Sequence, residues 1–130
     1  MGFCIFNTAT VAARHAQTAH GLARIAIFDF DVHHGNGTDD AFADDASVLY
    51  VSAHQEGSYP GTGKMSGVGR GDGEGATVNV TLPGDAGDAA YRALWEDVVL
   101  PRIDRFAPDL IIVSAGALRM LGVLCTIQTV

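Results

Sequence analysis

Two carboxylates and two imidazoles lie within six consecutive residues of this chain, Asp29-Phe30-Asp31-Val32-His33-His34. The apolar stretch before them, Ile25-Ala26-Ile27-Phe28, predicts a buried strand. If the extended backbone continues through the run, Asp29, Asp31 and His33 point to one face and His34 to the other. Carboxylate oxygens and imidazole nitrogens bind zinc, and open α/β sheets bind ligands beyond the carboxyl ends of their strands. The run therefore predicts a metal site at that edge of the sheet.

A solvated strand end is the alternative interpretation of the same residues. Acidic side chains and histidines are common in loops, where they are paired or hydrated because burying a bare charge is costly. A single residue of this kind would favour the solvated alternative. A cluster of four that leads directly into Gly35-Asn36-Gly37-Thr38 favours a metal or catalytic role.

Composition limits the class of protein. The chain has 130 residues, 48% of them hydrophobic and 18% charged, as expected for one globular domain at most. Its net charge of −7 disfavours a nucleic-acid-binding surface and is compatible with cationic substrates such as lysine side chains or polyamines. Cys4 and Cys125 form neither a metal-binding nor a disulfide spacing, which favours a reducing compartment such as the cytoplasm.

Neither a signal peptide nor a membrane span is expected. Residues 1–6 lack a basic start and a long apolar run. The apolar stretch 110–130 is interrupted by Ser114-Ala115-Gly116 and by Arg119, so it predicts a buried strand followed by a divergent tail.

Helices and strands are expected to alternate along the chain. A helix over 8–20 is predicted to begin at the cap residue Asn7 and to end at Gly21, with His15 and His20 on its surface. The other expected elements are strands over 24–30, 47–53 and 110–114, a short helix over 39–43, and a helix over 89–106 that Pro101 kinks or splits. This order predicts the α/β class, with an open parallel sheet covered by helices on both faces. The continuously apolar segments 25–28 and 110–113 are expected to be buried on both faces.

The glycine-rich segment 55–76 is longer than the roughly 12–15 residues of ordinary structureless loops, which indicates a functional or disordered segment. It is not a phosphate-binding P-loop, because Met65 stands where that motif needs Ser or Thr. Within it, Tyr59-Pro60-Gly61-Thr62-Gly63 predicts a tight turn that either presents Tyr59 to a ligand or carries it incidentally. The acidic pairs Asp39-Asp40 and Asp44-Asp45 are expected to be solvated charges at helix ends.

Taken together, five segments resemble the histone deacetylase superfamily, which comprises zinc-dependent deacetylases and acetylpolyamine amidohydrolases. They follow that family's order and are residues 2–7, 29–38, 50–55, 59–63 and 113–116. The resemblance covers residues 2–116 and corresponds to the middle of the family's catalytic domain. It implies an arginase/deacetylase-like sheet that is incomplete at both ends. Residues 1–116 would form a partial catalytic domain, and 117–130 a divergent tail of the kind that a reading-frame change produces.

The resemblance also implies a chemistry. One zinc ion would polarise an amide carbonyl and activate water, so that an acetylated lysine peptide or an acetylated polyamine is hydrolysed. By resemblance, Asp31 and His33 would be zinc ligands. Asp29 would orient a catalytic histidine and, together with Ser52, hold a structural potassium ion.

Three further positions receive roles from the same resemblance. Asn36 would support a second catalytic histidine. Gly2, Phe3 and Tyr59 would line the narrow channel that admits the acyl-lysine side chain. An apolar channel of this kind suits the alkyl stem of the substrate.

The chain departs from the family's pattern at the catalytic positions. The family's tandem histidines lie just upstream of its Gly-Phe-Cys segment, which here begins at Gly2. After Ser114-Ala115-Gly116 the family continues with Phe-Asp, the third zinc ligand, whereas this chain has Ala117-Leu118. The family's oxyanion-stabilising tyrosine has no counterpart. His54 and Asp29 are the remaining candidates for a third ligand. A catalytic zinc has three protein ligands and a water, so we expect weak zinc binding and an inactive chain.

Two alternatives remain open at this point. Segment 25–32 also resembles the signature of haloacid-dehalogenase phosphotransferases, with Asp29 as nucleophile, Asp31 as general acid and magnesium as cofactor. That signature does not explain the histidines at 33 and 34. The other alternative is a non-catalytic, degenerate fragment whose exposed apolar surface favours association.

Overall fold

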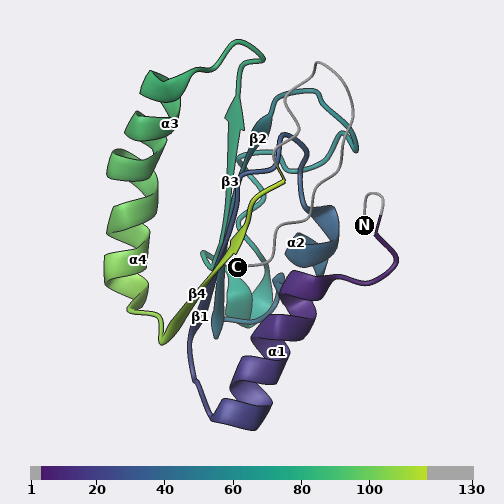
Figure 1. Cartoon of the computed structure of the whole chain (residues 1–130), viewed down its shortest axis with the longest axis vertical. Coiled ribbons are helices and arrows are strands. Elements are labelled where there is room, and N and C mark those ends of the chain that lie inside the picture. Colours follow the sequence, from purple (N-terminus) through teal and green to yellow (C-terminus); the bar gives the residue numbers. More distant parts are fainter. Residues whose placement is uncertain (1–3, 117–130) are drawn as a thin grey trace.

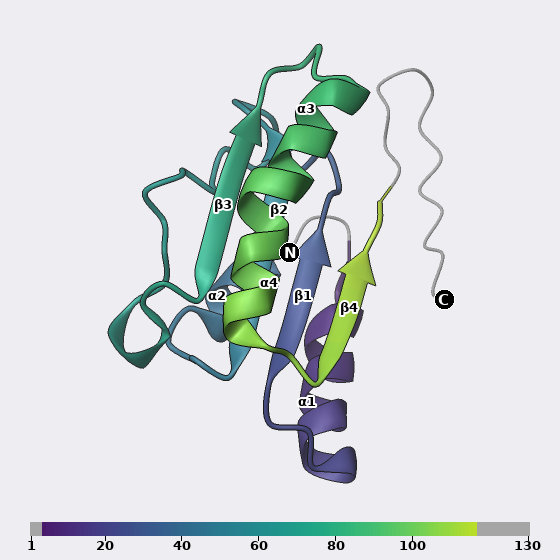
Figure 2. The ribbon, with the colours of Figure 1, turned by 90° about the vertical axis from the view of Figure 1, so that its left-hand side faces the viewer.

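The computed structural model describes residues 4–116 of the chain. Four parallel strands form one open sheet in the order β3-β2-β1-β4. In chain order they are β1 (Ile25–Asp29), β2 (Val48–Gln55), β3 (Thr77–Leu82) and β4 (Leu110–Ser114). One face carries α1 (Thr8–His20) and α2 (Asn36–Phe42), and the other carries α3 (Asp88–Leu94), η2 (Trp95–Val99) and α4 (Leu100–Phe106), as Figures 1 and 2 show. The predicted α/β class, with helices on both faces of a parallel sheet, is confirmed.

Helix α1 forms where its local sequence predicts it. The Asn7 side chain accepts a hydrogen bond from the Thr10 backbone N–H at 3.0 Å, which satisfies a donor that the first turn leaves unpaired. Gly21 ends the helix with φ of 67°, a left-handed conformation that glycine adopts without strain. Ala13 and Ala16 face the sheet, whereas His15 and His20 are exposed as expected.

Strand β1 separates two apolar cores because its side chains alternate between the faces of the sheet. Ile25 and Ile27 pack with Ala13, Ala16, Phe42, Val48 and Tyr50 on the side of α1 and α2. Ala26 and Phe28 pack with Leu49, Val51, Ala53, Val78, Leu94 and Val99 on the other side. All five residues of β1 are buried, so the run from Asp29 to His34 begins at the end of a fixed strand.

Strand β4 differs from the expectation of burial on both faces. Among the described residues 4–116 it pairs only with β1, at the edge of the sheet, and its burial is partial. Ile111 and Val113 remain 45% and 53% exposed. An apolar run of this length is equally compatible with an edge strand, because composition does not report how many neighbours a strand has.

Strand β3 was missing from the sequence-based prediction, which contained three strands. Its sequence alternates, with Val78, Val80 and Leu82 on the side of α3 and α4. Asn79 points to the other side, where its side chain contacts Asp39 of α2. The short 3-10 turn η1 (Gly71–Gly73) precedes it.

Two helices also differ from their expected bounds. Helix α2 begins at Asn36, three residues before the predicted start at 39. The predicted helix over 89–106 is continuous in Figure 2, but η2 widens to the π form just before Pro101. Proline lacks an N–H and its ring collides with the carbonyl four residues earlier, so a locally widened helix accommodates it.

No helix within residues 4–116 is both long enough and apolar enough to cross a membrane.

Candidate metal centre

Asp29 ends β1 with a buried carboxylate that is only 5% exposed. One carboxylate oxygen, Oδ1, accepts a hydrogen bond from the Asp31 backbone N–H at 3.1 Å. The other, Oδ2, accepts one from the Tyr50 hydroxyl at 3.3 Å, and the same hydroxyl lies 3.2 Å from the Gly35 carbonyl oxygen. The bond from the Asp31 N–H closes a turn where β1 ends, and the Tyr50 hydroxyl fixes the other carboxylate oxygen.

The environment of Asp29 changes its acidity. Burial raises the pKa of its carboxyl from 3.8 to about 6, although the Asp31 backbone N–H offsets part of this rise. Burial and the adjacent charge of Asp29 raise the pKa of Tyr50 well above 10. The phenol therefore keeps its proton and remains a hydrogen-bond donor to Asp29.

Asp31 and His33 come together in the turn that follows β1. The Asp31 Oδ1 atom accepts the His33 backbone N–H at 2.7 Å and lies 3.0 Å from His33 Nδ1. Both side chains are partly exposed, whereas His34 is buried. The strand alternation that the sequence suggested does not continue past Asp29, because β1 ends there and a turn, not a strand, brings the two donor atoms together.

The geometry of this pair fits two neighbouring ligands of a zinc ion. The separation of 3.0 Å is that of a hydrogen bond between the two side chains. It is also close to the roughly 3.3 Å that separates ligand atoms lying about 2.0–2.2 Å from a tetrahedral zinc, so an ion bound here would replace this bond. Gly116, just beyond β4, lies so close to Asp31 that a side chain at this position would overlap the carboxylate. The chain that leaves β4 therefore passes directly beside the pair.

A third protein ligand is not present in the described part of the chain. Within residues 4–116 no group of three His, Cys, Asp or Glu side chains could hold a metal ion. Asp29 and His54, the two further candidates from the sequence, therefore belong to no such group within these residues.

Ser52 lies opposite Asp29 in the register of β1 and β2 and is fully buried. Its hydroxyl oxygen is 3.0 Å from His54 Nδ1, and His54 Nε2 is 2.9 Å from the Gly63 carbonyl oxygen. Burial and the nearby His34 lower the pKa of His54, so its ring is neutral at pH 7. Because a carbonyl only accepts, Nε2 carries the proton and Nδ1 accepts the Ser52 hydroxyl proton. This direction leaves the lone pairs of Ser52 available, as a cation ligand requires.

The remaining predicted residues lie around this centre. Asn36 begins α2, where its backbone N–H donates to the His34 carbonyl oxygen at 2.9 Å. Tyr59 is 57% exposed, and its ring centroid lies 6.2 Å from that of His33. Gly2 and Phe3 lie outside the described residues.

A buried polar network beside the centre was not predicted. His34 Nδ1 lies 2.7 Å from Thr62 Oγ1, and His34 Nε2 lies 3.1 Å from Asp39 Oδ2. The Asn79 side chain donates to the same Asp39 oxygen at 3.1 Å and to the Gly67 carbonyl at 3.0 Å. The expectation that Asp39 is a solvated charge is therefore wrong. Burial opposes its ionisation, but the bonds from His34 and Asn79 outweigh burial and lower its pKa.

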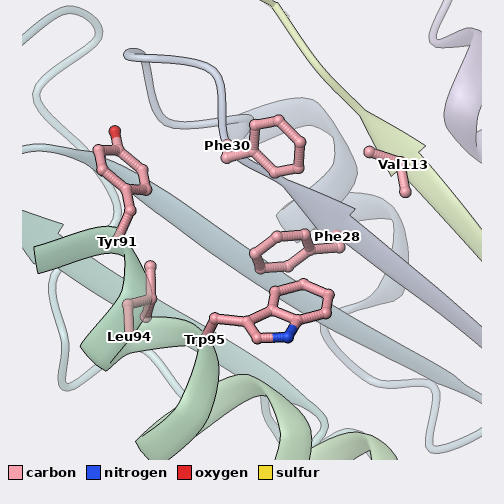
Figure 3. A pocket seen from close by; sticks show the side chains of 6 residues that line it. All are labelled: Phe28, Phe30, Tyr91, Leu94, Trp95 and Val113. Carbon is pink, nitrogen blue, oxygen red and sulfur yellow. The ribbon is translucent and has the colours of Figure 1, made fainter. Parts of the chain in front are cut away.

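An apolar pocket of about 400 Å³ lies on the opposite side of β1, between the sheet and α3 (Figure 3). Phe28 and Trp95 meet edge to face there, with ring centroids 5.1 Å apart. The other lining residues are Phe30, Tyr91, Leu94 and Val113. None of the six residues that line the pocket carries a carboxylate or an imidazole, so this pocket is separate from the cluster of Asp29, Asp31 and His33.

Known proteins resemble this chain over most of its length. A sequence model of the histone deacetylase domain matches residues 1–120. Histone deacetylase 14, chloroplastic, of Arabidopsis thaliana is 59% identical over 116 residues, which are 89% of this chain and 27% of that protein. Histone deacetylase 10, chloroplastic, of Oryza sativa subsp. japonica is 58% identical over 116 residues, 89% of this chain and 26% of that protein.

A solved structure gives the same result. The crystal structure of the HDA15 HD domain superimposes with a TM-score of 0.86 at 48% identity, covering 89% of this chain and 35% of that one. The chain thus spans about a quarter of the length of the two plant relatives. On the match of residues 1–120, this chain belongs to the histone deacetylase domain family.

Proposed function

We propose that this chain supplies part of the zinc site and one wall of the substrate channel of a deacetylase. The family acts on acetylated substrates and is generally zinc-dependent. The observation that carries the proposal is the separation of 3.0 Å between Asp31 Oδ1 and His33 Nδ1 at the carboxyl end of β1. The proposed substrates are acetylated lysine peptides or acetylated polyamines, in agreement with the acidic net charge of −7.

When bound, zinc would supply a Lewis acid for the amide carbonyl and lower the pKa of a bound water. The chain's own residues prepare this site. Asp31 and His33 offer two ligand atoms from one turn. Asp29, fixed by Tyr50, would orient a histidine base, and Asp29 and Ser52 would hold a potassium ion between neighbouring strands. Asn36 would support a second histidine, and Tyr59, with Gly2 and Phe3, would form the channel wall.

Zinc titration by isothermal calorimetry tests the proposal. We expect the wild-type chain to bind one equivalent of zinc, and Asp31→Ala and His33→Ala each to lose this binding. His20→Ala is the matched control, because His20 is exposed at the end of α1. Equal zinc binding by all four proteins would assign the metal to other residues and would contradict the proposal.

We further propose that the 130 residues do not hydrolyse an acetylated amide by themselves. Residues 1–116 would act as a partial catalytic domain and 117–130 as a divergent tail, which contains no carboxylate. Two protein ligands hold zinc less firmly than three, and residues 4–116 contain no group of three such ligands. We expect no turnover of an acetyl-lysine peptide above the buffer rate, with an active deacetylase assayed in parallel. Turnover that disappears in His33→Ala would contradict this.

The family match favours the amide hydrolase over the phosphotransferase alternative. The burial of Asp29 agrees with this preference, because a nucleophilic carboxylate must reach the phosphorus atom. For the compartment we propose the reducing cytoplasm, because the two cysteines form no disulfide framework. Two of the relatives are chloroplastic by name, so a plastid is the other outcome that localisation of a tagged chain would reveal.

A further inference from the structure

The turn that carries Tyr59 is held from two sides by histidines for which the proposed chemistry has no use. His34 Nδ1 contacts the Thr62 hydroxyl at 2.7 Å, and His54 Nε2 contacts the Gly63 carbonyl at 2.9 Å. His34 and His54 are 6% and 2% exposed, and their ring centroids lie 4.8 Å apart. Both rings are therefore fixed in the interior and close to one another.

Gly63 packs directly against both rings. A Cβ atom at this position would lie 2.5 Å from two carbons of the His34 ring and 2.6 Å from His54 Nε2. Its φ of 81° is in the left-handed region that favours glycine. Only glycine fits between the two rings with this backbone conformation. Together with the two hydrogen bonds, this close packing fixes the turn against His34 and His54.

The other ring nitrogen of each histidine contacts an element that lies beside the proposed metal centre. His34 directly follows His33, and its Nε2 contacts Asp39 of α2. His54 Nδ1 contacts Ser52, the register partner of Asp29. One histidine thus connects the turn to the proposed zinc site, and the other connects it to the proposed potassium site.

The direction of each bond follows from the acceptors. The Gly63 carbonyl and the Asp39 carboxylate only accept, so Nε2 of His54 and Nε2 of His34 both donate. His54 Nδ1 accepts the Ser52 hydroxyl proton, and His34 Nδ1 is hydrogen-bonded to the Thr62 hydroxyl. Each ring is therefore bonded through both of its nitrogens, which fixes its orientation.

We propose that His34 and His54 are positioning residues that hold the Tyr59–Gly63 turn against the metal centre and thereby place the Tyr59 wall of the acyl-lysine channel. This inference rests on the proposed function, because the channel role of Tyr59 is part of it. Tyr59 is more than half exposed, so burial contributes little to fixing its position. The bonds of Thr62 and Gly63 to the two histidines contribute more. Its ring stands at 77° to the His33 ring, within reach of any substrate that approaches that ligand.

Limited trypsin digestion under native conditions tests the anchoring, because Lys64 directly follows Gly63. His54→Phe keeps a ring but loses both polar atoms, whereas His54→Gln keeps a donor near the position of Nε2. We expect cleavage after Lys64 to accelerate about tenfold in His54→Phe, as the loss of one net hydrogen bond predicts, and to return toward the wild-type rate in His54→Gln. His20→Phe, on the exposed surface of α1, should leave the rate unchanged.

A second pair of variants avoids the buried interior. Thr62 is exposed, so Thr62→Val removes the hydroxyl that contacts His34 without disturbing a core, and Thr62→Ser retains it. We expect faster cleavage after Lys64 in the Val variant only. We also expect the nuclear Overhauser contact between the Tyr59 and His33 rings to weaken in Thr62→Val and to persist in Thr62→Ser.

Two results would overturn the positioning role. The first is that Thr62→Val and Thr62→Ser are cleaved after Lys64 at equal rates, as are His54→Phe and His54→Gln. The second is that the cleavage rates of all variants are explained by their free energies of global unfolding, measured in urea on the same proteins. Zinc titration of the wild-type chain separates this inference from the proposed function. Zinc binding with unchanged cleavage removes the positioning role alone, and altered cleavage without zinc binding removes the zinc-site function while the anchoring of the turn stands.

Discussion

Asp29 is the residue whose surroundings differ most from those of a hydrated carboxylate. Its pKa of about 6 lies above the ordinary value of 3.8, so the folded chain binds a proton more tightly than the unfolded chain between these values. Stability from this group is therefore present below about pH 4 and is lost as the pH rises through 6. A shift of this size corresponds to about 3 kcal/mol.

We predict that Asp29→Asn removes this component. In potassium-free buffer with a chelator, the free energy of unfolding of the wild type, relative to the Asn variant, should fall by about 3 kcal/mol from pH 4 to pH 7. Urea unfolding at a series of pH values measures it. Using the difference between the two proteins removes the opposite contributions of Asp39 and Asp45, whose pKa values are lowered. A difference that is flat with pH would show that Asp29 is hydrated in solution.

Tyr50 provides a second prediction at the scale of one residue. Tyr50→Phe removes the hydroxyl that donates to Asp29 and leaves a buried carboxylate with one donor fewer. We expect a loss of about 1–2 kcal/mol in the free energy of unfolding at pH 7 and a further rise in the pKa of Asp29. Tyr91→Phe, at the more exposed α3 surface, is the control. Carboxyl chemical shifts measured against pH report the pKa, and an unchanged value would exclude the bond.

At the scale of elements, the turn around Gly63 offers a matched pair of glycines. Gly61 and Gly63 have φ of 78° and 81°, but a Cβ at Gly61 meets nothing within 4 Å. Gly61→Ala therefore measures the backbone cost alone, about 1–2 kcal/mol. Gly63→Ala adds the overlap with His34 and His54, for which we expect roughly 1–3 kcal/mol more. Equal free energies of unfolding for Gly61→Ala and Gly63→Ala would show that the His34 and His54 rings move to admit the added methyl group without loss of stability.

Elements were predictable where their signals are local. The Asn7 cap, the Gly21 stop and the apolar run before Asp29 each lie next to the element that they define. The cluster of Asp31 and His33 was found for the same reason. The network of His34 and Asp39 was not, because Thr62 and Asn79 reach it from 28 and 40 residues away in the chain. The alternating sequence of β3 contained the signal for Asn79, but the glycine-rich segment before it masked the start of the strand.

At the scale of the whole molecule, the apolar edge strand has a physical consequence. Ile111 and Val113 of β4 are exposed, and Val113 also lines the pocket of Figure 3. Exposed strand edges with apolar side chains pair with other chains. We expect the 130-residue chain to self-associate in a concentration-dependent way and Ile111→Lys/Val113→Lys to reduce this association in sedimentation velocity. Val11→Lys, at an exposed position of α1, is the control. If it reduces self-association as much as Ile111→Lys/Val113→Lys does, the reduction comes from the change in net charge and not from the strand edge.

The central claim is that Asp31 and His33 offer two zinc ligands at the end of β1. The most direct measurement is the ¹⁵N resonance of the His33 ring during zinc titration. We predict that Nδ1 of His33 shifts and saturates at one equivalent of zinc, while the ring nitrogens of His54, which is buried, keep their shifts. A shift confined to the surface residues His15 and His20, with His33 unchanged, would contradict the claim.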